Sequence, residues 1–318
     1  MQALWQWLKQ ALVGQGQAHG FVQRRVLCAG PNELHQVAYT EWGDPQNPEV
    51  VVCVHGLSRN GRDFDHLARA LAGRYRVVCP DMPGRGASDW LQNKADYAIP
   101  TYVADMVTLI ARLNVDSVHW VGTSMGGVIG MELAAQARSP VRSLVLNDVG
   151  PFISGSTLAS LRDYLGKAPR FASVDAAEAY TRKVCGDAFG PLSDAHWRHL
   201  TEHAIRQTAD GDWEMCYDPG IAEAFKLPFL SFFHVDLWST YDAVRCPTLV
   251  LRGAESDVLA QDTYAEMARR GPRAKLVEVP GVGHAPMLLN DAEIAVVRDF
   301  LATQNAAGRG ETIGNTSA

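Results

Sequence analysis

One serine stands where it could act as a nucleophile. Ser124 lies in the run Gly122-Thr123-Ser124-Met125-Gly126, between a strand-like stretch (117–121) and a helix-like stretch of small residues (127–137). A sharp strand-to-helix turn strains its central residue and crowds the flanking backbone, which glycine relieves. The pattern alone is weak because glycine is common, so the flanking elements carry the prediction. They would present the Ser124 hydroxyl at the carboxyl end of a sheet, over a helix N-terminus that favours negative charge.

The elements around this turn predict a parallel sheet. Continuous apolar runs of this length are typical of strands buried on both faces. Such runs recur at Val50–Val54, Val77–Cys79, Val118–Val121, Leu144–Leu146, Thr248–Leu251 and Leu276–Val279. Helical periodicity lies between them, over 102–113 and over 294–301, the second after an Asn290…Glu293 capping pair. The alternation predicts a doubly wound, mostly parallel α/β sheet. Arg24–Cys28 and Glu33–Gly43 suit an antiparallel hairpin at its edge.

The alternation stops between Asp148 and Pro247. That stretch is too long for a structureless loop in a compact domain, so it must have elements of its own. Leu158, Leu161 and Leu165 share helical spacing, and Ser193 is typical of an N-cap. We therefore expect a mainly helical cap, residues 151–240, inserted after the sixth strand of a core formed by 21–150 and 241–303. An N-terminal helix (1–20) and a disordered tail (304–318) complete the predicted organisation.

The motifs together resemble the α/β-hydrolase superfamily, over about residues 34–302. The resemblance rests on the Ser124–Gly127 turn, on His55-Gly56 after the third strand, on Asp81-Met-Pro-Gly-Arg-Gly-Ala-Ser88 after the fourth, and on Gly283-His284 near the end. It implies a serine hydrolase, similar to esterases and lipases with a helical cap. It also implies the chain order nucleophile, acid, histidine, with each partner in a loop after a late strand.

His284 is the expected base. A serine hydroxyl is a poor nucleophile until an imidazole accepts its proton. Of ten histidines, His284 is the one in a loop directly after the predicted last strand, within Pro280–Pro286. The glycines and prolines of this loop suit a shaped turn that reaches over the strand ends.

For the acid, the prediction favours Asp257. It follows the strand Thr248–Leu251, the commoner position among members of the superfamily, and would hold the imidazole tautomer and stabilise the imidazolium. The alternative is Asp148, at the end of Leu144–Asp148, because some members place the acid there. In the favoured arrangement Asp148 caps or orients the start of the lid instead.

Two backbone amides are expected to hold the oxyanion of the tetrahedral intermediate. The resemblance assigns them to Met125, directly after the nucleophile, and to Leu57, directly after His55-Gly56. His55 itself is then a structural residue of that loop.

The resemblance implies cleavage of a carboxylic ester through an acyl-enzyme, with a small to medium, apolar acyl group. The aromatic segment Phe225–Trp238 would pack the cap onto the core or line an acyl pocket. Alternatives are cleavage of a carbon–carbon bond in a diketone, lactone opening and hydrolysis of hydroxyalkanoate oligomers. A different class also remains open, because some members of this fold bind small ligands as receptors.

Other partners are not indicated. A net charge of −6 gives no reason to expect nucleic acid. No cofactor or metal motif is present, since Gly84-Arg85-Gly86 lacks the third glycine of a dinucleotide fingerprint and no HExxH occurs. The expected partner is therefore a small-molecule ester, and the sequence does not predict an oligomeric state.

The cellular setting is predicted from cysteines and hydropathy. Six cysteines without a CxxC pair favour a reducing, cytoplasmic compartment. No run of about 18 apolar residues occurs, so no membrane span is expected. The N-terminal segment with Trp5 and Trp7 lacks signal-peptide features and would form a helix docked on the body or an interfacial anchor.

Overall fold

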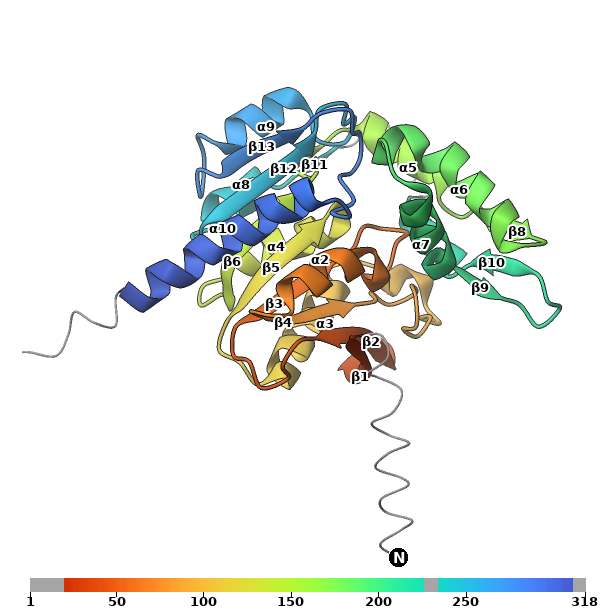
Figure 1. The fold of residues 1–318 in the computed structure, drawn as a ribbon, viewed down its shortest axis with the longest axis horizontal. Helices are drawn as coiled ribbons and strands as arrows, with labels where there is room; N and C mark the ends of the chain where they lie inside the picture. The colour runs from red at the N-terminus through yellow and green to blue at the C-terminus, as the bar shows by residue number, and fades with distance from the viewer. Residues whose placement is uncertain (1–19, 226–233, 311–318) are drawn as a thin grey trace, which may run out of the picture.

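A computed structural model describes residues 20–225 and 234–310 (Figure 1). Its centre is an eight-stranded sheet in the order β1-β2-β4-β3-β5-β6-β12-β13. The strands are β1 (Phe21–Ala29), β2 (Leu34–Trp42), β3 (Val50–Val54), β4 (Arg76–Pro80), β5 (Val118–Thr123), β6 (Val141–Asn147), β12 (Thr248–Gly253) and β13 (Lys275–Val279). Each of the six predicted buried runs falls on one of these strands, and β3 has the predicted bounds.

Most of the sheet is parallel, as predicted. The strands from β4 to β13 pair in parallel, whereas β1 pairs with β2 and β2 with β4 in antiparallel register. The expected edge hairpin is therefore confirmed. Because parallel strands share a direction, their carboxyl ends lie along one edge of the sheet, where ligands bind in α/β folds. The strands that end at this edge include β3, β5, β6, β12 and β13.

Helices cover both faces of the sheet. On one face α2 (Asp65–Leu71) and α10 (Asp291–Gly310) bury apolar side chains such as Leu67 and Val297. The opposite face packs against α3 (Ile99–Leu113), α4 (Met125–Ala134), α8 (Trp238–Ala243) and α9 (Gln261–Met267). Between β3 and α2 lies the short helix η1 (Gly61–Phe64), and η2 (Lys94–Asp96) precedes α3.

The last helix begins as predicted and ends later. Oδ1 of Asn290 accepts a hydrogen bond from the Glu293 amide at 2.9 Å, which satisfies one of the unpaired donors at the helix start. The prediction of a disordered tail from residue 304 is wrong as far as Gly310, because α10 continues to that residue. Ala306 and Ala307 favour this continuation. Residues 311–318 lie outside the described part.

The insertion between β6 and α8 contains the predicted helices and two small sheets that were not predicted. In chain order its elements are β7 (Phe152–Ile153), α5 (Gly155–Tyr164), β8 (Arg170–Phe171), α6 (Val174–Phe189), α7 (Asp194–Ala204), β9 (Ile205–Gln207), β10 (Trp213–Met215), η3 (Pro219–Phe225) and β11 (Val235–Asp236). The side chain of Ser193 accepts a hydrogen bond from the His196 amide and caps α7 as expected. Strands of two or three residues are too short to show a period, which is why the pattern did not predict them.

This cap is hydrogen-bonded to the loops of the core. Nδ2 of Asn60 donates to the His203 carbonyl at 2.7 Å, and the Gly86 amide donates to the Cys216 carbonyl at 2.9 Å. The Tyr97 hydroxyl donates to the Asp218 carboxylate at 2.6 Å. The cap therefore roofs the edge at which the parallel strands end (Figure 1).

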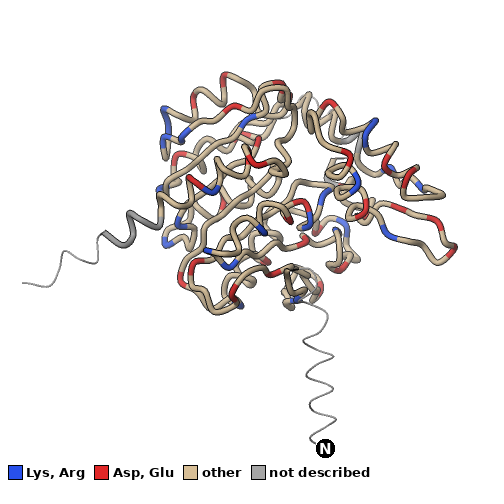
Figure 2. The backbone as a smooth tube through the Cα atoms, viewed as in Figure 1, with Lys and Arg blue, Asp and Glu red and all other residues tan. Residues whose placement is uncertain are grey.

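Two of the expectations fall on residues outside the described part. They concern the N-terminal helix (1–19) and most of the aromatic segment (226–233). Within the described ranges no helix is both long and apolar enough to cross a membrane. Acidic and basic residues are intermingled over core and cap (Figure 2), in keeping with the small net charge.

Candidate active site

Ser124 occupies the strained turn that the glycine pattern predicts. It follows β5 and precedes α4 with φ 52° and ψ −116°, a backbone conformation that non-glycine residues rarely adopt. A Cβ on Gly126 would lie 2.0 Å from the Val54 carbonyl oxygen, and one on Gly122 would lie 2.3 Å from the Gly126 carbonyl oxygen. Both positions therefore exclude any larger residue, and the turn lifts the Ser124 hydroxyl over the sheet edge.

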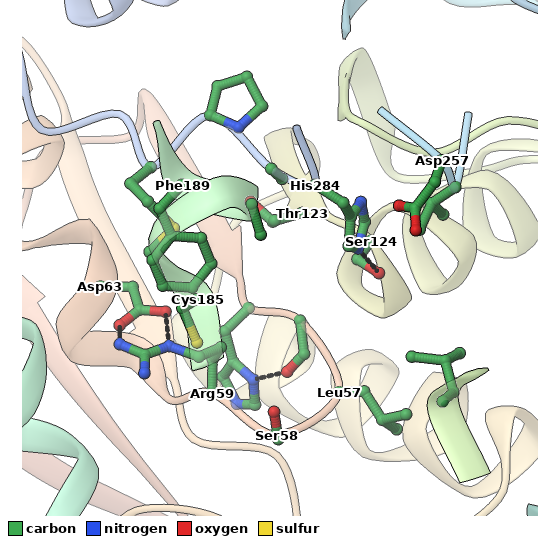
Figure 3. Close-up of a pocket in the computed structure, with 18 of the residues that line it drawn as sticks. Leu57, Ser58, Arg59, Asp63, Thr123, Ser124, Cys185, Phe189, Asp257 and His284 are labelled. Carbon is green, nitrogen blue, oxygen red and sulfur yellow. Dashed lines mark hydrogen bonds and ion pairs between the residues drawn. The ribbon is translucent and has the colours of Figure 1, made fainter. Parts of the chain in front are cut away.

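His284 lies against this serine. The loop between β13 and α10 carries it, as predicted, and its Nε2 is 2.9 Å from Ser124 Oγ (Figure 3). The imidazole is partly buried, with 20% of its side chain exposed. A neutral imidazole in this position can accept the hydroxyl proton.

The carboxylate behind the histidine belongs to Asp148. Its Oδ2 lies 2.7 Å from Nδ1 of His284, and the side chain is fully buried. With the Nδ1 proton donated to this carboxylate, Nε2 is left as the acceptor for the Ser124 hydroxyl. The expectation that Asp257 would hold the imidazole is therefore wrong in this structure, and the alternative Asp148 takes the place.

Asp257 makes no hydrogen bond to His284 in the described part of the chain, where the imidazole bonds to Asp148 and Ser124. It is exposed and lines the same cavity as His284 (Figure 3). Its backbone carbonyl accepts a hydrogen bond from Thr157 Oγ1 at 3.2 Å. Asp148 and Asp257 both follow strands that end at the same edge of the sheet. Their positions in the sequence therefore could not show which carboxylate turns toward the imidazole.

Asp148 is held by the neighbouring loop. The Gly253 amide donates to its Oδ1 at 2.9 Å, and the Ser256 hydroxyl donates to its Oδ2 at 2.6 Å. A buried carboxylate needs such donors. Burying even a neutral polar group without a hydrogen bond costs roughly 2–7 kcal/mol, and burying a charge costs more. Ser256 is a site residue that the sequence did not single out; its place directly before Asp257 was the only signal.

The two expected oxyanion donors flank the serine. Leu57 and Met125 both line a cavity that Ser124 also lines. Nearby amides have other partners: Arg59 N donates to Gly56 O, Ser124 N to Asn147 O and Gly127 N to Ser124 O. Met125 is the first residue of α4, so its amide has no acceptor within the helix.

His55 is a structural residue of the oxyanion loop, as expected. Its Nδ1 lies 2.7 Å from the Gly56 carbonyl, which can only accept, so Nδ1 carries the proton. Nε2 then accepts from the Met82 amide at 2.9 Å. Burial lowers the pKa of His55 to about 4, so the ring stays neutral. Its two hydrogen bonds connect the loop after β3 to the turn after β4.

Ser124 lies where two cavities meet. One, of about 380 Å³, contains His284 and the polar side chains of Arg59, Asp63 and Asp257. The other, of about 780 Å³, contains Met125 and a mainly apolar lining that includes Val128, Ile153 and Leu158. Leu57, Ser124 and Leu161 line both. Space is thus available on each side of the nucleophile.

Comparison with known proteins identifies the family of the chain. The profile of the Alpha/beta hydrolase family matches residues 51–297, most of the chain. The chain belongs to this family. A solved structure of an alpha/beta hydrolase from Novosphingobium aromaticivorans superposes with a TM-score of 0.80 at 34% identity, over 89% of this chain and 98% of that one. The predicted fold class is therefore confirmed.

Characterised relatives of this alpha/beta hydrolase are hydrolases. It is 48% identical, over 88% of its length and 96% of the relative's, to the 3-hydroxybutyrate-oligomer hydrolase of Cupriavidus necator. It is 29% identical to the N-formylmaleamate deformylase of Pseudomonas putida, over 79% and 88% of the two chains. The protein is accordingly a hydrolase.

Proposed function

We propose that this protein is a serine esterase that hydrolyses the ester bonds of short 3-hydroxybutyrate oligomers. The observation that carries the proposal is the chain of hydrogen bonds from Ser124 through His284 to Asp148, placed at the junction of two cavities. Such a chain is suited to acyl transfer.

The mechanism follows from which atom lies beside which. Ser124 Oγ attacks the ester carbonyl while Nε2 of His284 takes its proton, and the amides of Leu57 and Met125 stabilise the oxyanion. The buried Asp148 carboxylate stabilises the imidazolium that forms. When the tetrahedral intermediate collapses, the C–O bond breaks, His284 returns the proton to the leaving alkoxide, and the acyl group stays on Ser124. Water then repeats the sequence and frees the acid.

The two cavities assign the two halves of the substrate. The leaving oxygen must receive its proton from His284, so the alcohol half belongs in the cavity that His284 lines. The acyl half then extends into the cavity beside Met125, whose apolar walls suit a methyl-bearing chain.

An oligomer of a hydroxy acid fits this division better than a simple acetate does. Each internal ester of the oligomer carries further chain on both its acid and its alcohol side. A single deep pocket would accept only one of the halves. The 48% identity to a relative named for this substrate supports the same choice.

The test is hydrolysis of the 3-hydroxybutyrate dimer and trimer, followed by release of the monomer. We expect turnover by the wild type and a loss of at least about 10³-fold in kcat for Ser124→Ala, because no other group replaces the nucleophile. Ser117→Ala, directly before β5, is the matched control and should keep wild-type activity. If the wild type leaves the oligomers intact, the substrate assignment is wrong.

The reaction class is tested separately. A receptor on this fold would bind ligands without acylation, whereas a competent hydrolase reacts with a fluorophosphonate at its activated serine. We expect stoichiometric labelling at Ser124. A wild type that is folded but unlabelled would favour the receptor function.

We also propose a cytoplasmic location. All six cysteines are free, as expected for a protein in a reducing compartment. Cell fractionation with an antibody to the protein tests this, and recovery from an oxidising compartment would contradict it.

A further inference from the structure

A buried guanidinium lies directly behind the oxyanion loop. Arg85, in the turn after β4, has no exposed surface. Its Nε donates to the Leu57 carbonyl at 2.7 Å, and one terminal nitrogen lies 3.8 Å from Sδ of Met125. One side chain therefore contacts both residues that supply the proposed oxyanion donors.

The other partners of Arg85 are neutral. Its second terminal nitrogen donates to the Pro83 carbonyl at 2.6 Å and to the Tyr102 hydroxyl at 2.7 Å. The ring faces of Tyr97 and Tyr102 lie 5.6 and 5.3 Å from the guanidinium carbon. Among the side chains that the structure describes, no carboxylate lies within ion-pair distance of Arg85.

This arrangement is unusual for a buried charge. A guanidinium stays protonated in proteins, and a buried charge is normally paired with an opposite one. Dipoles and ring faces stabilise the cation here, but they do not neutralise it. In the part of the chain that the structure describes, the resting enzyme therefore holds a positive charge without an ion-pair partner, close to the two residues that supply the proposed oxyanion donors.

We infer that Arg85 is a positioning residue that also supplies a fixed counter-charge for the oxyanion. It holds Leu57 by the carbonyl oxygen of that residue and contacts the first residue of α4 at the same time. In a site of low dielectric, a charge that is already in place favours the transition state over the neutral ester. The inference rests on the proposed acyl transfer at Ser124.

Two substitutions separate charge from shape. Arg85→Gln removes the charge and keeps a donor for the Leu57 carbonyl, whereas Arg85→Lys keeps the charge and loses the planar fork. With p-nitrophenyl butyrate as substrate, we expect Gln to lower kcat by about 10- to 100-fold with KM changed less than about threefold. Lys should retain kcat within about fivefold. Arg112→Gln, which removes the same charge from an exposed position of α3, should stay within about threefold.

The affinity for a boronic acid is a measurement that would not change if Arg85 had a purely structural role. The boronic acid forms a tetrahedral anionic adduct on the serine, so its affinity should fall in Arg85→Gln by about the same factor as kcat/KM. Affinity for a neutral ketone analogue that binds without forming an adduct should be unchanged. Equal losses of kcat in the Gln and Lys variants would contradict the counter-charge role of Arg85. Equal losses of affinity for boronate and ketone would contradict it too.

The design also covers a variant that does not fold. If thermal unfolding shows that Arg85→Gln is not folded, Arg85→Lys decides alone: boronate affinity near wild type supports the inference, and a loss beyond 10-fold overturns it. Because p-nitrophenyl butyrate is not an oligomer, these results do not depend on the natural substrate. A wild type that cleaves p-nitrophenyl butyrate but not the oligomers would remove only the substrate assignment.

Discussion

The carboxylate of Asp148 lies 2.6 Å from the hydroxyl oxygen of Ser256, the residue directly before Asp257. The end of β12 and the loop after it thus reach the buried acid with the Gly253 amide and a hydroxyl, while Asp257 in the same loop is exposed. The residue after β6 supplies the acid that holds His284, and the neighbouring strand β12 and its loop supply the donors to that acid. This sharing leads to the first two predictions.

Asp148→Asn should lower kcat by about 10³- to 10⁴-fold, because an amide can stabilise the wrong imidazole tautomer and cannot stabilise the imidazolium. The matched change Asp257→Asn should keep kcat within about threefold. Both are measured with p-nitrophenyl butyrate at pH 7.5, together with thermal unfolding. The reverse ranking, a large loss of kcat for Asp257→Asn and a small one for Asp148→Asn, would mean that Asp257 is the acid.

Ser256→Ala should lower kcat/KM by about 5- to 50-fold. It removes one donor to a charged group, an interaction worth about 1.5–3 kcal/mol, but leaves the Gly253 amide and His284 in place. Ser256→Thr, which keeps the hydroxyl, should recover much of the loss. If Thr and Ala are equally impaired, the hydroxyl does not support the acid.

Gly126→Ala should destabilise the fold by more than about 3 kcal/mol, because its Cβ would lie 2.0 Å from the Val54 carbonyl oxygen, which belongs to the sheet and cannot move cheaply. The control is Gly186→Ala in α6, where a Cβ meets no atom within 4 Å. That change should stabilise the protein by about 0.5–1 kcal/mol, through higher helix propensity. Urea unfolding measures both, and a mild effect at Gly126 would contradict the crowded turn.

Filling one cavity should affect one half of the substrate. Ile153→Trp narrows the cavity beside Met125, so kcat/KM for p-nitrophenyl octanoate should fall at least about 10-fold more than for the acetate. Val184→Trp narrows the cavity beside His284, and should discriminate against bulky alcohols at constant acyl length. Should the two variants show the opposite selectivities, the halves are assigned to the wrong cavities.

Stability should depend on pH through His55. Burial lowers its pKa to about 4, from an ordinary value of 6.5, so the unfolded chain binds the proton more tightly. The contribution of neutral His55 to the free energy of unfolding is therefore present above pH 6.5 and is lost as pH falls toward 4. The loss is on the order of 3 kcal/mol.

The measurement is urea unfolding of wild type and His55→Gln between pH 4 and 7.5. The difference in unfolding free energy between the two proteins should grow as pH rises through this window. Other shifted groups, such as His66, with a pKa lowered to about 4, and Asp81, with a pKa raised to about 6, are common to both proteins and cancel in the difference. A difference that is constant with pH would mean that His55 is not kept neutral by burial.

The sequence by itself determined the features that local signals specify. Small residues at 122 and 126 are required by the crowded turn, so the pattern located Ser124. Apolar runs that must be buried on both faces located the parallel strands, and the last of these located His284. In each case the physical cause acts over a few neighbouring residues, which a sequence displays directly.

The tertiary structure decided what depends on how separate loops meet. Asp148 and Asp257 follow strands β6 and β12, which pair side by side, so only the orientation of each side chain chooses between them. Asp148 adopts φ 55° and turns its carboxylate inward, onto donors from Gly253 and Ser256. The contacts of Arg85 with Leu57 and Met125, and the two cavities at Ser124, likewise join segments that are distant in the chain. No local pattern records such meetings, because burial and hydrogen bonding across loops determine them.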